Sequence, residues 1–257
     1  MRRLPLMVAC FAVTLATTTH AYTFGPWGCN LRWDHCYGDG GVANKSFACD
    51  VNTGTETLVA SFVPAWDIAN VSGLEIVINL ASASPTLPAW WQFKNAGTCR
   101  QLSLSASPVP ADPTVTNCPD WGAGGQAGGL AAYAIGLFGP NSARILLAWA
   151  VPPQSLRFLS GRHEYFAQKL AIDHAKTVGT GACAGCTTPV CIVLQSVNMT
   201  TPNFANDRWL TGPANQTDSD YATWQGGLGV GSPLGTGCPA ATPTRRRSWG
   251  EVKALYR

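Results

Sequence analysis

Short stretches in which apolar and polar residues alternate recur along this chain, each bounded by Gly, Pro, Asn or Ser. In GLEIVINL, Leu74, Ile76, Ile78 and Leu80 fall on one side of an extended backbone and the intervening residues on the other, which predicts a strand with one buried face. Many short strands joined by Gly/Pro-rich turns are typical of a β-sandwich. We therefore predict an all-β fold, a single antiparallel β-sandwich of jelly-roll-like or immunoglobulin-like topology. The other predicted strands are Thr57–Val63, Arg100–Ser105, Leu130–Phe138, Ala143–Val151 and Val190–Met199.

The segment Arg162–Lys176 fits either a helix or a strand. Phe166, Leu170 and Asp173 have helical spacing, whereas Phe166, Leu170, Ile172 and His174 share one side of an extended chain. Because Gly161 precedes the segment and Gly179 follows it, we favour a strand, which would form a hairpin with Val190–Met199.

The segment Ser105–Gly129 is rich in Pro and Gly and lacks an apolar period, so we predict a long surface loop. Neither side of the loop has a clearly sufficient set of strands for a separate domain. We therefore predict one domain over residues 22–244.

The first residues have the layout of a secretory signal. Arg2 and Arg3 precede an apolar stretch, and Thr19-His20-Ala21 offers small side chains before Tyr22. We predict that residues 1–21 are cleaved as a signal peptide and that the protein is secreted, to the periplasm, the cell surface or the medium. Cys10 raises a lipoprotein alternative, but the apolar run before it is very short.

The predicted mature chain is nearly uncharged. Only 12% of the residues are charged, and removal of residues 1–21 lowers the formal net charge from +3 to about +1. This gives no electrostatic reason to expect nucleic acid as a partner. The apolar stretch Leu130–Val151 is interrupted by a Gly-Pro turn, so we predict no transmembrane segment. No cofactor is predicted.

Nine cysteines remain after the predicted cleavage, and in an oxidising compartment most of them should pair. Cys99 and Cys118 bracket the Pro-rich loop, so we favour that pair first. Because nine is odd, we expect one unpaired thiol among Cys29, Cys36 and Cys49, either free or linked to another chain. The nine are Cys29, Cys36, Cys49, Cys99, Cys118, Cys183, Cys186, Cys191 and Cys238.

The stretch GTGACAGCTTPVCIVL leaves three interpretations of its cysteines open. Cys183, Cys186 and Cys191 could join Cys238 as four zinc ligands. The spacing of Cys183 and Cys186 also fits a redox pair, although such a pair needs a helix N-terminus and glycines surround this one. We favour structural disulfides that staple a turn leading into a strand.

The adjacent Trp90 and Trp91 are the candidate ligand-binding residues. On a strand, neighbouring residues face opposite ways, so we expect one indole in the core and the other directed outward. An outward ring could stack on a sugar or contact a protein partner. Packing of both rings under a loop is the alternative.

No catalytic motif is present, so we predict no catalytic residue and no metal ligand. A secreted glycosidase-like hydrolase built from scattered residues remains an alternative, since carboxylate pairs in such enzymes come from distant strands. Two metal clusters are weaker alternatives: His163, Glu164, Asp173 and His174, or a calcium site from Asn215, Asp218 and Asp220. The hydrolase candidates are Asp67, Glu75, His163, Glu164 and Asp173.

The C-terminus is predicted to be a basic tail or short helix over residues 245–257. In SWGEVKALYR, Trp249, Val252 and Tyr256 have near-helical spacing, and Lys253 and Arg257 lie late, where they suit the helix dipole. It either caps the sandwich or serves as a sorting or attachment tail.

Several motifs resemble a group of uncharacterised bacterial secreted proteins that end in a similar module. They are KTVGTGACAGCTTPVCIVLQSV, YATWQGG, GCPAATP and SWGEVKALYR, with a weaker similarity at LPAWWQFKNAGTCR. The resemblance mainly covers Ser155–Arg257. It implies a bacterial, exported protein and no activity or cofactor.

Taken together, these features predict an exported, non-enzymatic surface or extracellular protein with a binding or structural role. Its partner is unknown, a glycan or a cell-envelope component being the candidates. The alternatives are the secreted hydrolase and a covalently linked assembly subunit, which the odd cysteine suggests.

Overall fold

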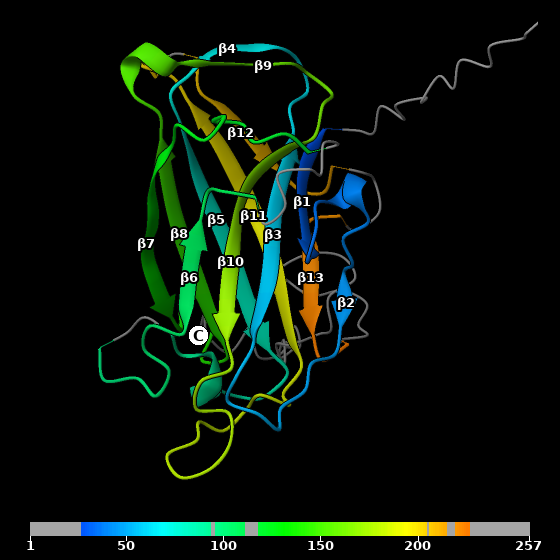
Figure 1. Ribbon diagram of the computed structural model, residues 1–257, viewed down its shortest axis with the longest axis vertical. Helices are drawn as coiled ribbons and strands as arrows, with labels where there is room; N and C mark the ends of the chain where they lie inside the picture. Colours follow the sequence, from blue (N-terminus) through cyan, green and yellow to red (C-terminus); the bar gives the residue numbers. More distant parts are fainter. Residues whose placement is uncertain (1–26, 94–95, 111–117, 205, 215–218, 227–257) are drawn as a thin grey trace, which may run out of the picture.

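The computed structural model describes residues 27–93, 96–110, 118–204, 206–214 and 219–226. Within them two sheets lie face to face, and a short two-stranded ribbon closes one end (Figure 1). The smaller sheet has the order β1-β3-β10-β6 and the larger one β2-β13-β11-β5-β8-β7, with β12 beside β11. The predicted all-β sandwich is confirmed.

The strands follow the chain in this order: β1 Gly28–Trp33, β2 Asn44–Lys45, β3 Thr55–Val63, β4 Ile68–Val71, β5 Gly73–Ser82, β6 Leu104–Ser107, β7 Ala127–Ile135, β8 Ser142–Ala150, β9 Arg157–Leu159, β10 Tyr165–Asp173, β11 Val190–Thr200, β12 Arg208–Thr211 and β13 Tyr221–Trp224. Three short 3-10 turns join them: η1 Tyr37–Asp39, η2 Ala89–Trp91 and η3 Pro153–Ser155. The ladders between these strands are antiparallel, except the two-residue pairing of β2 with β13.

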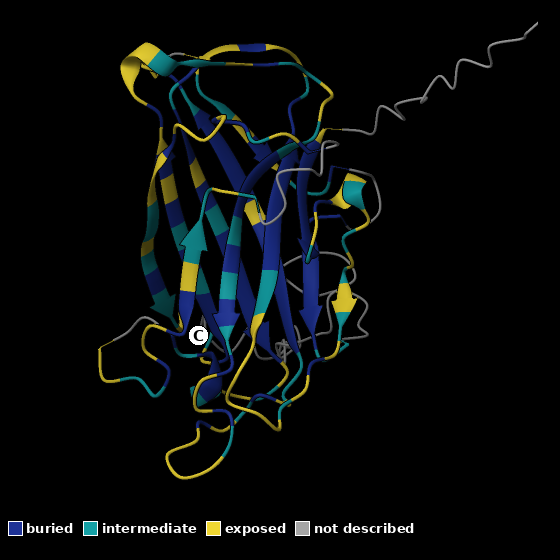
Figure 2. Ribbon diagram, in the orientation of Figure 1, coloured by how far each residue is buried: buried dark blue, intermediate teal, exposed yellow. Residues whose placement is uncertain are grey.

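The core lies between the two sheets, where buried residues line the facing sides of the strands (Figure 2). On β5 the expected alternation is present: Leu74, Ile76, Ile78 and Leu80 are each at most 1% exposed, whereas Glu75 is exposed. Burial of these side chains, at about 1.5–3 kcal/mol each, fixes the register because a shift of one residue would turn them outward.

The segment Arg162–Lys176 contains β10, so the predicted strand is confirmed, but the predicted hairpin is wrong. β10 pairs with β3 and β6 in the smaller sheet, whereas β11 pairs with β5, β12 and β13 in the larger one. The connection 174–189 crosses from one sheet to the other instead of turning back in the same plane. Period-2 patterning defines strands and does not say which sheet each one joins.

Two boundaries around the Pro-rich loop also differ from the prediction. The strand expected at Arg100–Ser105 begins only at Leu104, and Arg100 lies in a turn with its side chain in the interior. The loop is not wholly a surface excursion: the Phe166 amide donates to Pro119 O over 2.9 Å, and the Trp121 side chain is buried. This part of the loop therefore packs alongside β10.

The predicted signal peptide, Cys238 and the predicted C-terminal helix or tail at 245–257 lie outside the described residues. Those predictions are unchanged by the structure. In the part of the chain that the structure describes, no helix is long and apolar enough to cross a membrane.

Candidate functional site

Neither Trp90 nor Trp91 faces outward, so the expectation of one exposed indole is wrong. The two residues form the turn η2 and are 0% and 1% exposed. A 3-10 turn does not alternate sides as a strand does, and both rings point into the core. In this structure they offer no surface to a ligand.

Both indoles belong to an aromatic cluster between the two sheets, at the end of the sandwich away from β4 and β9. Trp224 is its centre: its ring centroid lies 3.9 Å from that of Phe47, 4.8 Å from Trp90 and 5.4 Å from Trp91. Its indole N–H donates to Cys186 O over 2.6 Å. The other members are Trp33, Phe93 and Tyr133.

A buried arginine completes this cluster. The Arg100 side chain is 0% exposed, and its guanidinium carbon lies 3.6 Å from the centroid of the Trp90 ring. Its Nη1 donates to Trp90 O, and Nη2 lies 3.6 Å from a carboxylate oxygen of Asp173. Burial lowers the pKa of Arg100 to about 10, and Asp173 opposes that shift. Arg100 therefore stays charged at neutral pH, held by the ring and the carboxylate.

The cysteines of the glycine-rich stretch form structural disulfides. Cys183 bonds to Cys99 and Cys186 bonds to Cys49. This excludes the zinc set, because zinc binds thiolates, and the redox pair, because Cys183 and Cys186 each bond to a distant cysteine and not to one another. Cys191 is disulfide-bonded as well. The two described bridges tie the connection 174–189 to distant parts of the chain, beside the aromatic cluster.

The favoured pairing of Cys99 with Cys118 is wrong, since Cys118 bonds to Cys36, 82 positions away. Loop ends that are close in sequence were expected to pair, but the actual pairs join segments that the sandwich brings together. The predicted unpaired thiol is present in the N-terminal group: Cys29 is free among the described cysteines. It is 0% exposed, and burial raises the pKa of its thiol well above the usual range.

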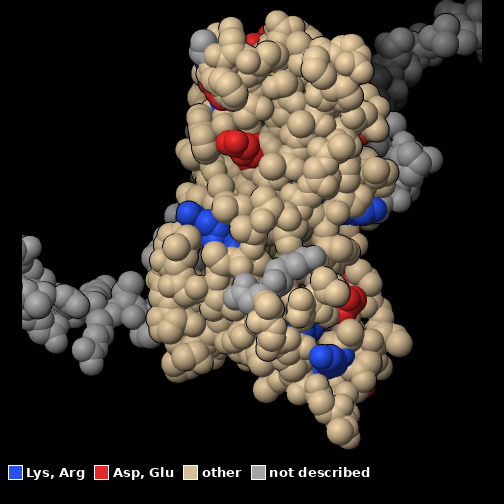
Figure 3. Space-filling view, turned by 90° about the vertical axis from the view of Figure 1, so that its left-hand side faces the viewer, with Lys and Arg blue, Asp and Glu red and all other residues tan. Residues whose placement is uncertain are grey.

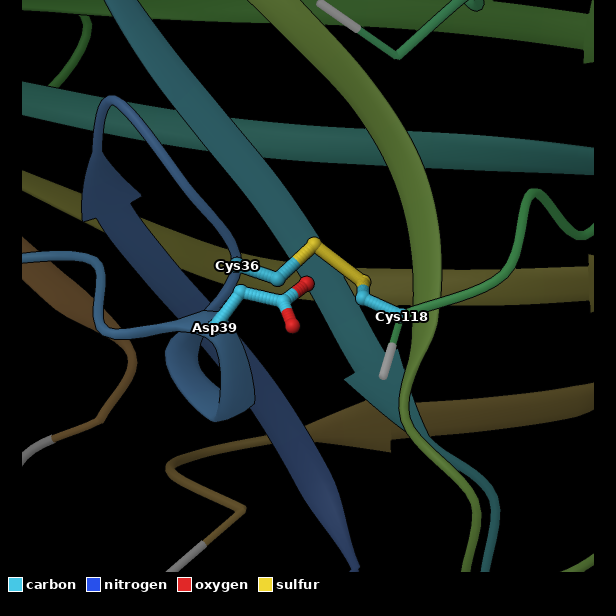
Figure 4. Close-up of side chains that lie close together, drawn as sticks. All are labelled: Cys36, Asp39 and Cys118. Carbon is cyan, nitrogen blue, oxygen red and sulfur yellow. A yellow bond between two sulfur atoms is a disulfide. The ribbon is translucent and has the colours of Figure 1, made fainter. Parts of the chain in front are cut away.

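One group of residues has the geometry of a metal site but not its chemistry. The ligand atoms of Cys36, Asp39 and Cys118 lie within 4.8 Å of one another. The two sulfur atoms are bonded to each other, and the Asp39 carboxylate lies beside the bond (Figure 4). A disulfide lacks the thiolate that a transition metal binds, so the group does not form a metal site in this state.

Glu164 holds four segments together. Its carboxylate accepts hydrogen bonds from the Asn30 amide, the Ser61 hydroxyl and the backbone N–H groups of Tyr37 and Gly38. Burial raises the pKa of Glu164, and these donors oppose the shift by favouring the charged form. Because its oxygens are occupied by donors from β1, η1 and β3, the group fits a structural role.

Replacement of this carboxylate tests that assignment. Glu164→Gln should lower the free energy of unfolding by about 1–3 kcal/mol, because an amide N–H₂ would face at least one of the donors and leave it unsatisfied. Urea unfolding followed by circular dichroism measures the loss.

The matched control is Glu75→Gln on β5, where the exposed carboxylate accepts one hydrogen bond from Asn198 and the amide oxygen of glutamine can accept it instead. The effect of this control on the free energy of unfolding should stay within about 0.5 kcal/mol. Equal effects would contradict the structural role.

Two of the hydrolase candidates lie far apart. Glu164 and Asp173 lie at opposite ends of β10, about 30 Å apart at ~3.3 Å per residue, which is well beyond the ~10 Å upper range of glycosidase carboxyl pairs. For the same reason His163, Glu164, Asp173 and His174 do not form a metal cluster. Asp67 accepts a hydrogen bond from the Gly161 amide, His163 contacts the Gly161 oxygen, and both side chains are exposed.

His174 enters a chain of polar contacts. Its Nε2 lies 3.0 Å from Glu56, whose other oxygen lies 3.6 Å from Lys45 Nζ, and Lys45 donates to both oxygens of Asp34. These contacts join β2, β3 and the end of β10 and fit a structural network. For the calcium alternative, Asn215 and Asp218 lie outside the described residues, and Asp220 is buried.

The surface feature that sequence reasoning missed is a set of exposed aromatic rings. They lie at the end of the sandwich where β1 and β12 begin and where β4 and β9 pair (Figure 1). We call this surface the aromatic end. Its rings are 57–75% exposed and come from four separate parts of the chain: Trp27, Trp66, Phe158, Phe204 and Trp209.

Local contacts hold the loops of the aromatic end in place. The amide of Gly161 donates to Asp67 over 2.7 Å, which ties the loop of Trp66 to the one that follows β9. In the turn of Phe204, Asp207 accepts bonds from the backbone N–H and the hydroxyl of Thr201. Trp66 and Phe204 therefore project from hydrogen-bonded loops, which lowers the entropy lost when a partner binds.

Phe204 is unusual in two respects. It is 75% exposed, and its φ of 55° lies in the left-handed region that bulky residues rarely adopt. Neither packing nor backbone preference explains a phenylalanine here, where Gly or Asn would fit better. An exposed phenylalanine in an unfavourable backbone conformation suggests that its ring contacts a partner.

The chain matches no protein-family model, no curated protein and no solved structure in the comparisons made. The candidate site therefore rests on its own geometry.

Proposed function

We propose that the protein acts outside the cytoplasm as a non-enzymatic binding or structural protein, and that its aromatic end is the surface that contacts a glycan or another cell-envelope component. The observation that carries the proposal is the collection of five rings, each more than half exposed, at one end of the sandwich. Exposed aromatic rings that gather on one surface, instead of being scattered singly, mark interaction sites.

Export is supported by the predicted signal at residues 1–21 and by the three described disulfides. Disulfides persist in oxidising compartments and are rare where thiols are kept reduced. The resemblance to bacterial secreted proteins agrees with this and stays a prediction.

The two alternatives have less support. The hydrolase requires two carboxyl groups within about 10 Å in a pocket, and its candidates are either dispersed or, like Glu164, occupied by hydrogen-bond donors. The covalently linked subunit requires a thiol that reaches another chain, and Cys29 is buried. We therefore favour binding over both.

The test is retention on a bacterial cell-envelope preparation. A variant with Trp66→Ala, Phe158→Ala, Phe204→Ala and Trp209→Ala should lose retention by at least about tenfold, because large exposed rings dominate binding energy where they are buried by a partner. The matched control is Phe138→Ala, an exposed ring on the turn between β7 and β8 at the opposite end of the sandwich. Both variants should keep the wild-type melting temperature within a few degrees.

Equal retention of the two variants would assign binding to another surface. Absence of retention of the wild-type protein would count against a binding role in the envelope.

A further inference from the structure

We infer that the aromatic end binds a neutral polysaccharide, an inference that rests on the proposed function and names its ligand class. The inference comes from the kinds of side chain that accompany the rings. Each of three loops at this end carries an exposed ring together with an exposed side-chain amide: Trp66 with Asn70, Phe158 with Gln154, and Phe204 with Asn203 and Asn206.

Rings and amides together match the two kinds of surface on a sugar. The C–H face of a pyranose is apolar and packs on an aromatic ring, while its hydroxyl groups both donate and accept hydrogen bonds. A side-chain amide likewise carries two donors and an acceptor, so it pairs with hydroxyls without needing a charge. A few polar groups beside apolar platforms are sufficient to orient a ligand.

Charged side chains of both signs lie at this end. The cations are Arg157, Arg162 and Arg208. The carboxylates are Asp67, Asp207, Glu164 and Glu75, whose partner Asn198 lies opposite Trp209, and each of them accepts hydrogen bonds from the protein. Arg208 donates to the backbone oxygen of Asp207. Because cations are not in excess among these residues, this end does not attract a polyanion over a distance, and its charges are compatible with a neutral ligand.

The same features disfavour a lipid surface. Interfacial segments combine an apolar face with an excess of Lys or Arg that meets anionic headgroups, and the aromatic end has no such excess. Insertion of its rings would also carry the neighbouring amides into an apolar medium, where unpaired amides are costly. Figure 3 views the sandwich from its side and not onto the aromatic end; there, charged side chains stand apart from one another on uncharged surface.

Binding to defined probes tests the inference. The folded protein is mixed with microcrystalline cellulose, with chitin, or with a soluble neutral β-glucan in a native gel, and with vesicles of neutral and anionic phospholipid. We expect retention on at least one of the polysaccharides, competition by its soluble oligosaccharides, and little change between about 50 and 500 mM NaCl, because no ion pair carries the contact.

Two variants separate the contributions of rings and amides. Trp66→Ala with Trp209→Ala should weaken binding by about tenfold or more, and Gln154→Ala with Asn203→Ala by several-fold. Phe138→Ala, an exposed ring on the turn at the opposite end of the sandwich, should leave binding unchanged. These four substitutions that test the aromatic end are all at exposed positions, so the variants are expected to fold.

Two outcomes overturn the inference and are distinguishable from failure of the proposed function. If the wild-type protein binds none of the polysaccharides, or binds the vesicles instead, while the envelope preparation still distinguishes the ring variants, the proposed function stands and the neutral polysaccharide is wrong. If the ring variants are retained on the envelope preparation as well as the wild type is, both fall together.

Discussion

Trp90→Ala should lower the free energy of unfolding by about 3–5 kcal/mol, the range expected when a large buried aromatic side chain is truncated. The indole is 0% exposed, packs against Trp91 and Trp224 and donates its N–H to Thr177. Its loss would also remove the ring on which the buried Arg100 guanidinium lies and leave that charge in a cavity.

The same substitution at an exposed indole provides the control. Trp209→Ala should change the free energy of unfolding by no more than about 0.5 kcal/mol, because Trp209 is 60% exposed on β12. Urea unfolding followed by far-ultraviolet circular dichroism compares the two without relying on tryptophan fluorescence. If Trp90→Ala were as stable as Trp209→Ala, the assignment of Trp90 to the core would be wrong.

Removal of the Cys49–Cys186 bridge should have an effect of similar size. With the other described bridges in place the loop that it closes is shorter than its sequence separation of 137, and the chain-entropy model then gives about 4 kcal/mol. The double variant Cys49→Ala/Cys186→Ala should therefore unfold at a much lower urea concentration than the wild type.

Cys29→Ala is the matched control for the bridge, since it removes a buried cysteine that is not in a disulfide. It should cost only about 1 kcal/mol, for the small cavity it creates. If the double variant lost less free energy of unfolding than Cys29→Ala does, the Cys49–Cys186 bridge would not constrain the unfolded chain as the structure requires.

Strands were predictable from the sequence because alternation is a local property. β5, β8 and β11 appear where the pattern placed them, within one or two residues at most ends. Sheet membership was not predictable, since β10 and β11 have equally clear patterns and join different sheets. Disulfide pairing failed for the same reason: Cys118 meets Cys36 only after β1, β3 and β10 have assembled.

The candidate surface is not evident in the sequence, whose densest aromatic motif belongs to the core. Trp90 and Trp91 follow Pro88 in a turn, and that turn brings both rings into the core. The aromatic end comes from single rings in separate segments, which only the fold brings together. One local signal was available: Phe204 stands within TPNFANDR, a polar turn with no apolar partner for a ring to pack against.

We therefore propose different tasks for the two ends of the sandwich. The end with the aromatic cluster, Arg100 and two disulfides stabilises the fold. The opposite end presents exposed rings on loops and short strands. Such a division fits the proposed function, in which one end of a rigid scaffold contacts a partner.

The most direct measurement is the intact mass of the exported chain, taken after alkylation of the native and of the unfolded, unreduced protein. We expect a chain that begins at Tyr22, takes up no alkylating reagent when native, and takes up one equivalent when unfolded, at Cys29. A chain that retains residues 1–21, or several thiols that react in the native protein, would contradict the claim that this is an exported sandwich closed by disulfides.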